Sequence, residues 1–186
     1  MGVELIDTKY INRCDLKLLI SKDDINKKVE SISMLLEKEY KNKNPIIICV
    51  LNGAFIFFAD LVRNLNFDFE IDFIKLSSYG NKMKSSGTVR MIKDISADLT
   101  GRDVIIVEDI IDTGLTINYL RKRMIDAGVK SISFATCLLK QRKSYKFDFK
   151  IDYIGFNIPD RFVIGYGLDL NQKFRGLDSI YTLKKD

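Results

Sequence analysis

Histidine is absent from the 186-residue sequence. Its absence excludes Ser/His/Asp and Cys/His triads, histidine general bases and every zinc site that uses imidazole. Any catalysis must therefore use carboxylates, lysines, hydroxyls, backbone amides or a metal ion held by oxygen.

Cysteine and long apolar runs are also scarce. The three cysteines, Cys14, Cys49 and Cys137, form no CxxC pair, and the latter two lie in or beside apolar runs. This pattern favours buried free thiols and a reducing compartment. There is no N-x-[ST] sequon, the first ten residues lack the pattern of a signal peptide, and no apolar run approaches the length of a membrane span. We expect a cytoplasmic protein with no membrane partner.

Length and charge indicate one folded domain, residues 1–186. Apolar residues are 46% and charged residues 30% of the chain, the balance of a globular protein. Thirty Lys and Arg against 25 Asp and Glu give a net charge of +5. Because the charges are dispersed, an ordinary solvated surface is the favoured interpretation. The alternative is an anionic ligand, for which nucleic acid and a polyphosphate would serve equally well, and composition does not choose between them.

The hydrophobic pattern alternates between helix and strand. Helical spacing predicts helices over residues 25–40, preceded by a capping box at Ser21 and Asp24, and also over 54–65 and 117–124. Apolar or alternating runs predict strands over 46–51, 67–73, 89–92, 104–107, 132–139, 151–156 and 162–166, and residues 77–87 read as a loop. The pattern predicts an α/β fold with a mainly parallel sheet flanked by helices, plus a smaller subdomain from the strand-rich final third.

One segment, VIIVEDIIDTGLT over residues 104–116, combines groups suited to a ribose phosphate. Glu108 and Asp109 end a buried strand, where two adjacent carboxylates repel each other unless they bind hydroxyls or a cation. Residues 113–116 offer backbone amides and two hydroxyls at a helix N-terminus, which suits a phosphate. A simple helix cap would explain Asp112 or Thr113 alone, but not the acidic pair.

This segment resembles the phosphoribosyl pyrophosphate (PRPP) signature of the type I phosphoribosyltransferases. Three further segments, LNGAFIFFADLV from Leu51, SSYG from Ser77 and IGFNIPDRFVIGYGLDLNQKFR from Ile154, resemble the hypoxanthine-guanine branch. The match runs in order from about residue 45 to the C-terminus. The resemblance implies a mainly parallel twisted sheet and a small hood formed by terminal segments, roughly 1–20 and 150–186.

The resemblance also implies residues for PRPP. Glu108 and Asp109 would hold the ribose hydroxyls, directly or through Mg²⁺, and Asp112 would be the general base or hydrogen-bond partner at purine N7. The 5-phosphate would lie against Thr113, Gly114, Leu115 and Thr116. Leu51, Asn52 and Gly53 match the pyrophosphate loop, whose first peptide is often cis in the family, and Arg175 would also meet pyrophosphate. Ser78 and Tyr79 match the mobile loop that closes over the reaction.

On the purine side, the resemblance implies that Phe162 stacks on the base and that the backbone of Val163 reads its edge. Asp169 would bind a second Mg²⁺. Taken alone, Phe162 and Val163 are typical of a strand core, and Asp169 is typical of a surface ion pair. The lysine for the 6-oxo group matches Lys140 if one residue is inserted, whereas an ungapped count gives Gln141; we choose Lys140, because that group requires a cationic donor.

The implied activity is purine salvage, in which the 5-phosphoribosyl group of PRPP passes to N9 of hypoxanthine, guanine or both. Mg²⁺ is the implied cofactor, and the implied assembly is a homodimer or homotetramer without nucleic acid. The alternative is a phosphoribosyltransferase-like regulator that senses nucleotides and binds nucleic acid. Enzymes for orotate or adenine are opposed by IPDRFVIGYGLD. One departure is Asn52, which stands where many members have Lys or Arg.

Overall fold

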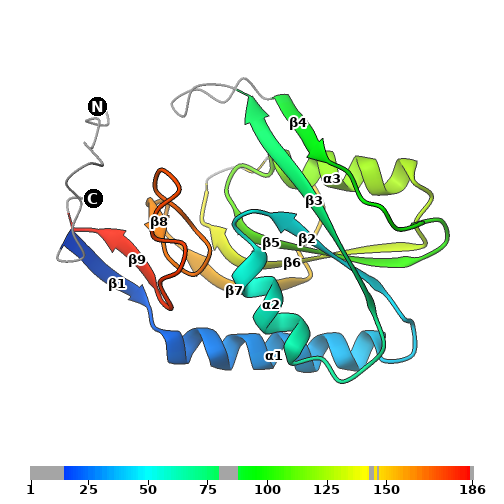
Figure 1. The fold of residues 1–186 in the computed structure, drawn as a ribbon, viewed down its shortest axis with the longest axis horizontal. Helices are drawn as coiled ribbons and strands as arrows, with labels where there is room; N and C mark the ends of the chain where they lie inside the picture. The colour runs from blue at the N-terminus through cyan, green and yellow to red at the C-terminus, as the bar shows by residue number, and fades with distance from the viewer. Residues whose placement is uncertain (1–14, 80–87, 143–144, 146, 185–186) are drawn as a thin grey trace.

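The computed structural model describes residues 15–79, 88–142, 145 and 147–184. Figure 1 shows a large sheet with a smaller one beside it. The large sheet has the strand order β4-β3-β2-β5-β6-β7 and the small sheet β1-β9-β8. In chain order the elements are β1 Leu16–Ile20, α1 Lys22–Tyr40, β2 Ile46–Leu51, α2 Phe55–Arg63, β3 Glu70–Tyr79, β4 Thr88–Lys93, β5 Asp103–Ile111, α3 Leu115–Asp126, β6 Ser131–Lys140, β7 Tyr153–Ile158, β8 Val163–Ile164 and β9 Ile180–Leu183.

The large sheet is parallel except at one edge. β2 pairs in parallel with β3 and β5, β6 pairs in parallel with β5 and β7, and only β4 runs antiparallel, against β3. The expected α/β fold with a mainly parallel sheet is therefore confirmed. Because parallel strands end at the same side, the turns after β2, β5 and β6 all lie along one edge of the sheet.

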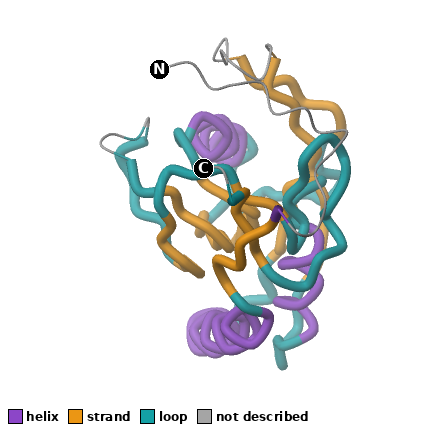
Figure 2. Tube along the Cα trace, turned by 90° about the vertical axis from the view of Figure 1, so that its left-hand side faces the viewer, coloured by secondary structure: helices purple, strands orange, loops and turns teal. Residues whose placement is uncertain are grey.

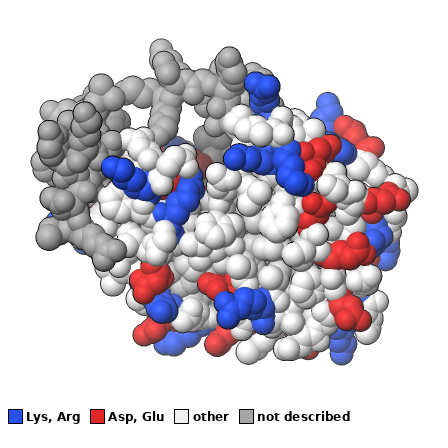
Figure 3. Space-filling view, viewed as in Figure 1, with Lys and Arg blue, Asp and Glu red and all other residues white. Residues whose placement is uncertain are grey.

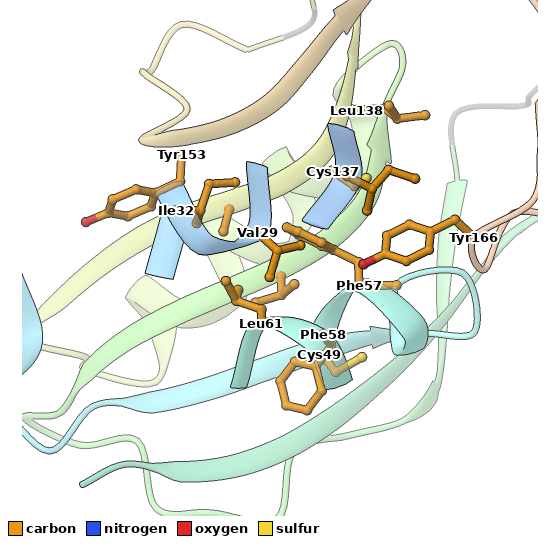
Figure 4. Packing of buried hydrophobic residues seen from close by; sticks show 14 of the residues in the cluster. Val29, Ile32, Cys49, Phe57, Phe58, Leu61, Cys137, Leu138, Tyr153 and Tyr166 are labelled. Carbon is orange, nitrogen blue, oxygen red and sulfur yellow. The ribbon is translucent and has the colours of Figure 1, made fainter. Parts of the chain in front are cut away.

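Helices cover both faces of this sheet. Ile47 and Cys49 pack in one cluster with residues of α1 and α2, while Ile46 and Ile48 pack in a second cluster with residues of α3. Figure 2 shows the strands between these helical layers, and Figure 4 shows part of the first cluster, including Phe57 on α2. Burial on both sides explains why β2 is continuously apolar rather than alternating.

The start of α1 follows the expected capping box. The Asp24 amide donates to Ser21 Oγ at 3.2 Å, and the Ser21 hydroxyl donates to Asp24 Oδ2 at 2.6 Å. These bonds satisfy a backbone donor that the helix leaves free at its start. The apolar stripe of the helix is buried as its spacing predicts, at Ile25, Val29, Ile32, Leu36 and Tyr40.

The region around β3 differs from the prediction. The strand begins at Glu70 rather than Phe67, and the rings of Phe67 and Phe69 pack edge-on with centroids 5.8 Å apart, before the strand. β3 then continues through Ser77 to Tyr79, where a loop is expected, because these residues pair with β4. The rest of that expected loop, residues 80–87, lies outside the described residues.

The small sheet assembles segments that are distant in the sequence. β1 and β9, which no sequence pattern predicts, pair antiparallel, and β9 also pairs with β8. β8 is shorter than the predicted strand 162–166 because the chain turns at Gly165 and Tyr166, both with positive φ. The small sheet lies in the segments expected to form the hood. β7 pairs with β6 and so belongs to the large sheet, which means that the C-terminal part of the hood begins after Ile158, later than the expected residue 150.

The described cysteines and surface charges agree with the composition. Cys49 and Cys137 are buried free thiols, and burial raises the pKa of Cys49 to about 12; Cys14 lies outside the described residues. On the face in Figure 3, Lys and Arg side chains are interspersed with Asp and Glu. No helix within the described ranges is long and apolar enough to cross a membrane.

Asp72, a buried carboxylate of β3, holds the connection that follows β4. Its Oδ2 accepts the amides of Ser96 at 2.6 Å and Ala97 at 2.8 Å, and its Oδ1 lies 3.4 Å from Lys93 Nζ. Burial by itself would raise the pKa of Asp72. The amide hydrogen bonds, with a smaller contribution from Lys93, outweigh burial and lower it.

We predict that Asp72→Asn lowers the free energy of unfolding by about 1–3 kcal/mol at neutral pH, because an amide NH₂ cannot accept these N–H groups. The folded pKa is lowered, so the stabilisation is complete above the usual carboxyl pKa of 3.8 and is lost as pH falls through the folded value. Urea titrations at pH 7 and pH 3 should therefore show a difference between wild type and variant that shrinks in acid. Asp68→Asn, at an exposed position, is the control; an equal loss in both variants would contradict the assignment.

Candidate active site

The acidic pair lies near the end of β5, against the core. Glu108 is only 6% exposed, and Asp109 is half-buried, with Oδ1 accepting its neighbour's amide, that of Ile110, at 2.7 Å. Burial raises the pKa of Glu108 well above its usual range, and the Asp109 charge raises it further. Burial also raises the pKa of Asp109, although hydrogen bonds and Arg175 oppose the rise. A cation or hydroxyl donors would relieve this charge, which makes the pair a candidate site for a metal ion or a sugar diol.

Next along the chain is the turn into α3. Gly114 precedes the helix with φ of 89°, a conformation that favours glycine, and a Cβ there would overlap the ring of Phe147. Since glycine has no side chain to cap the helix, the first amides, including those of Leu115 and Thr116, need an acceptor from elsewhere. Together with the half-buried Thr113, this turn can receive a phosphate.

The loop after β2 comes close to both the acidic pair and the hood. Its Leu51–Asn52 peptide is cis, as the resemblance implies. A Cβ at Gly53 would overlap Asp109 Oδ2, and a Cβ at Gly167 would overlap the carbonyl oxygen of Gly53. Glycine at both positions therefore permits three segments of the chain to approach one another.

The hood loop brings Arg175 and Asp169 together. Arg175 donates to the carbonyl of Gly167 at 2.7 Å and forms an ion pair with Asp169 Oδ1 at 2.9 Å. Asp169 Oδ2 accepts the Gln172 amide at 2.8 Å. Arg175 also opposes in part the burial that raises the pKa of Asp109, so its positive charge acts on the acidic pair. In the described part of the chain, no three acidic or cysteine side chains converge into a metal cage, so Asp169 does not complete one with Glu108 and Asp109.

The other end of the site is a group of opposite charges. Lys140, with a side chain only 13% exposed, has Nζ 3.4 Å from Asp112 Oδ2 and 3.4 Å from Asp160 Oδ1. Arg142 contacts Asp112 and lies 2.7 Å from Asp160 Oδ2. Sequence reasoning missed Asp160 and Arg142, although both stand close to residues that it selected.

The position of Lys140 bears on the choice between two neighbours. Gln141 is exposed, and its backbone N–H donates to the carbonyl oxygen of Ile158 at 2.8 Å. The chain is therefore extended here, and the side chains of residues 140 and 141 lie on opposite sides. The side chain of Lys140 is the one that reaches Asp112. Phe162 is 44% exposed, and the adjacent Val163 is buried in β8.

Comparison with known proteins identifies the family. The model of the phosphoribosyl transferase domain matches residues 19–171. The hypoxanthine-guanine phosphoribosyltransferase of Bacillus subtilis is 45% identical over 168 residues, which cover 90% of this chain and 93% of that protein. The enzyme of the same name from Aquifex aeolicus is 39% identical, over 95% of this chain and 99% of that one.

Solved structures that resemble this chain carry the same family name as these sequence relatives. A hypoxanthine phosphoribosyltransferase from Staphylococcus aureus superposes with a TM-score of 0.86 at 35% identity, covering 92% of this chain and 93% of that one. A hypoxanthine-guanine phosphoribosyltransferase from Bacillus anthracis, with HEPES in its active site, has a TM-score of 0.84 at 40% identity, covering 90% and 98%.

The chain belongs to the hypoxanthine-guanine phosphoribosyltransferase family. The expected fold, transferase class and role in purine salvage are thereby confirmed. These relatives give no support to the alternative of a nucleic-acid-binding regulator.

The last two expected residues of this phosphoribosyltransferase, Ser78 and Tyr79, end β3. β3 runs parallel to β2 and Leu51 pairs with Lys75, so Ser78 and Tyr79 extend past the end of β2 on the side of the site. Their backbones pair with β4, opposite Val89 and Thr88. The remainder of the expected mobile loop, residues 80–87, is outside the described residues.

We predict that Gly53→Ala abolishes most turnover while the protein remains folded, because the new methyl group must displace the Asp109 carboxylate. Steady-state kinetics with PRPP and hypoxanthine should show a fall in kcat/KM of about 100-fold, the loss that a misplacement of ~1 Å can cause. Gly176→Ala is the matched control, since a Cβ at Gly176 meets nothing within 4 Å. Unchanged kinetics in Gly53→Ala would contradict the close approach to Asp109.

Proposed function

We propose that this chain transfers the 5-phosphoribosyl group of PRPP to N9 of hypoxanthine or guanine at the carboxyl edge of its large sheet. The observation that carries this proposal is the order of groups along that edge. An acidic pair with raised pKa values lies on β5, and an arginine from the hood acts on it. The start of α3, which has no side-chain cap, follows it, and a lysine–aspartate pair lies at the end of β6. Ribose, phosphate, pyrophosphate and purine each have a complementary group.

For the sugar, Glu108 and Asp109 would bind the ribose hydroxyls, and the amides and hydroxyls of residues 113–116 would bind the 5-phosphate. The raised pKa values of the two carboxyls support this role, because they reflect negative charge that lacks compensation in the free protein. Binding at both ends fixes the ribose, so its C1 is presented to the purine in a defined orientation.

Departure of pyrophosphate leaves positive charge on the sugar and negative charge on the leaving group. Arg175 and the loop over Leu51, Asn52 and Gly53 would hold pyrophosphate, with backbone amides acting where Asn52 provides no charge. Carboxylates near the sugar would stabilise the oxocarbenium-like centre. Ser78 and Tyr79 remain proposed members of this part of the site.

Mg²⁺ is the proposed cofactor, and the acidic pair fits it. Glu108 and Asp109 supply the carboxylate oxygens that Mg²⁺ prefers, and Mg²⁺ usually completes its coordination with substrate phosphates and water. When bound, it would neutralise charge on pyrophosphate. Asp169 is proposed as a ligand of a second ion, which requires that Arg175 release its carboxylate.

On the purine side, Lys140 would donate to the 6-oxo group while Asp112 accepts the proton from N7. As the N9–C1 bond forms and the bond from C1 to pyrophosphate breaks, that proton passes to the carboxylate. Phe162 would stack on the base, which its exposed ring permits, and the Val163 backbone would read the base edge.

The wider context is also proposed. The buried free thiols are compatible with a reducing compartment, so we place the enzyme in the cytoplasm. The proposed assembly is a homodimer or homotetramer, with small-molecule substrates and without nucleic acid or membrane.

A panel of bases tests the activity. The protein is mixed with PRPP, Mg²⁺ and, separately, hypoxanthine, guanine, xanthine, adenine or orotate, and nucleotide formation is followed by chromatography. We expect IMP or GMP from a 6-oxopurine and nothing from orotate. Product only from adenine or orotate would contradict the substrate assignment, and no product from any base would favour the regulator.

We predict that Asp112→Asn lowers kcat by about 100-fold or more, because the amide cannot take the N7 proton. PRPP binding, measured by calorimetry with Mg²⁺, should remain largely intact, since the acidic pair and residues 113–116 are unchanged. Asp126→Asn, at the exposed far end of α3, is the control. Equal turnover in Asp112→Asn and wild type would contradict the role of the base.

A further inference from the structure

Four charged side chains at the purine end form a closed ring in which each carboxylate gives one oxygen to each cation. Arg142 contacts Asp112 Oδ1 through its guanidinium, while Lys140 Nζ lies 3.4 Å from Asp112 Oδ2. Asp160 is likewise shared, with Oδ2 2.7 Å from Arg142 Nη1 and Oδ1 3.4 Å from Lys140 Nζ. The two cations therefore use different oxygens of Asp112.

The backbone explains why both cations reach the same carboxylates. The extended chain of β6 continues past its last residue, with the Gln141 amide bonded to the Ile158 carbonyl at 2.8 Å. In an extended chain, side chains two residues apart point to the same side. Lys140 and Arg142 thus face Asp112 together, and Gln141 faces solvent.

The proposed reaction places a conflicting demand on Lys140. Its ammonium is needed at the purine 6-oxo group, yet in the free protein it lies between two carboxylates. When it turns to the purine, Asp112 and Asp160 lose a cation and would repel each other unless another group stays between them. A guanidinium suits this task better than an ammonium, because its planar fork can hold two carboxylates at once in a fixed geometry.

We propose that Arg142 is a positioning residue of the purine site. It holds Asp112 by Oδ1 and Asp160 by Oδ2, so Lys140 is free to turn to the 6-oxo group and Oδ2 of Asp112 becomes available to N7. Arg142 also connects the turn after β5 with the segment that leads from β7 to Phe162 and Val163. This inference rests on the proposed function, and it adds a residue whose effect on the purine is exerted through Asp112.

The experiment compares four proteins: wild type, Arg142→Ala, Arg142→Lys and Arg102→Ala. Arg102 is a matched control because its side chain is exposed to the same extent, 28%, and it also joins a carboxylate, Glu70 Oε1 at 2.7 Å. It precedes β5 and therefore lies at the opposite edge of the sheet. For each protein we would measure kcat, KM for hypoxanthine, KM for PRPP and the melting temperature, with and without added guanidinium chloride at low concentration.

We expect Arg142→Ala to lower kcat by about tenfold or more, the loss typical of a hydrogen bond to a charged group, with the KM for PRPP unchanged. Arg142→Lys should recover part of the loss, since it restores the charge but not the fork. Guanidinium should raise turnover of Arg142→Ala and leave Arg102→Ala unaffected. A purely structural role would not produce this rescue.

Three results would overturn the inference. They are a kcat of Arg142→Ala within about twofold of wild type, a loss that appears as a raised KM for PRPP, and a lowered melting temperature with no rescue by guanidinium. The last two would assign Arg142 to pyrophosphate or to folding. Inactivity of wild type with every base would instead contradict the proposed function.

Discussion

The parallel pairing of β2, β5 and β6 is the constraint on which the site depends. In register, Ile46 pairs with Val104, and Val104 pairs with Ile132, so the three strands advance together toward one edge. Each strand is buried between two helical layers, which fixes it by hydrophobic contact on both faces. The turns that follow these strands carry polar residues, which are not required for the packing of the hydrophobic core. They can therefore be occupied by functional groups, as is usual for open parallel sheets.

The electrostatics of this edge are unfavourable at one end and balanced at the other. Glu108 and Asp109 are held together by adjacent backbone positions, and burial raises the pKa of both. At the purine end, two carboxylates and two cations neutralise each other. In the free protein, the charge of Arg175 thus compensates the acidic pair only in part, whereas the purine end has a cation ready to exchange partners. Binding of substrate and metal would add positive charge at the acidic pair and would rearrange the ion pairs at the purine end.

The missing histidine has a consistent explanation in this arrangement. The proton that the proposed reaction moves goes to a carboxylate, Asp112, and the groups around it are Lys140, Arg142 and Asp160. In the proposed reaction, the acidic pair would stabilise charge on the sugar and Arg175 would stabilise charge on pyrophosphate. Each of these tasks needs a fixed charge or a hydrogen bond at a defined place, and no group needs to titrate near neutral pH.

Local sequence determined the elements whose cause is local. The capping box at Ser21, the apolar stripe of α1 and the continuous apolar run of β2 each predict the observed structure, because side-chain spacing and burial are read directly from neighbouring residues. The signature over residues 104–116 likewise predicts an acidic pair near the end of a buried strand and a turn into a helix, and the structure has both. β1 and β9 could not be found in this way, since β1 becomes a strand by pairing with β9, more than 150 residues away, and β9 is held between β1 and β8.

The same distinction applies to the site. The sequence by itself determined the candidates for the chemistry. Glu108, Asp109 and Asp112 stand in one recognisable motif. Lys140 is preferred to Gln141 because the 6-oxo group of a purine requires a cationic donor. Only the tertiary structure decided that Arg175 acts on Asp109 and that Lys140, rather than Gln141, faces Asp112. It also brought Arg142 and Asp160 into one ring with them. These relations depend on the register of paired strands and on a hood loop folding back, which are properties of the whole chain and leave no mark at a fixed spacing in the sequence.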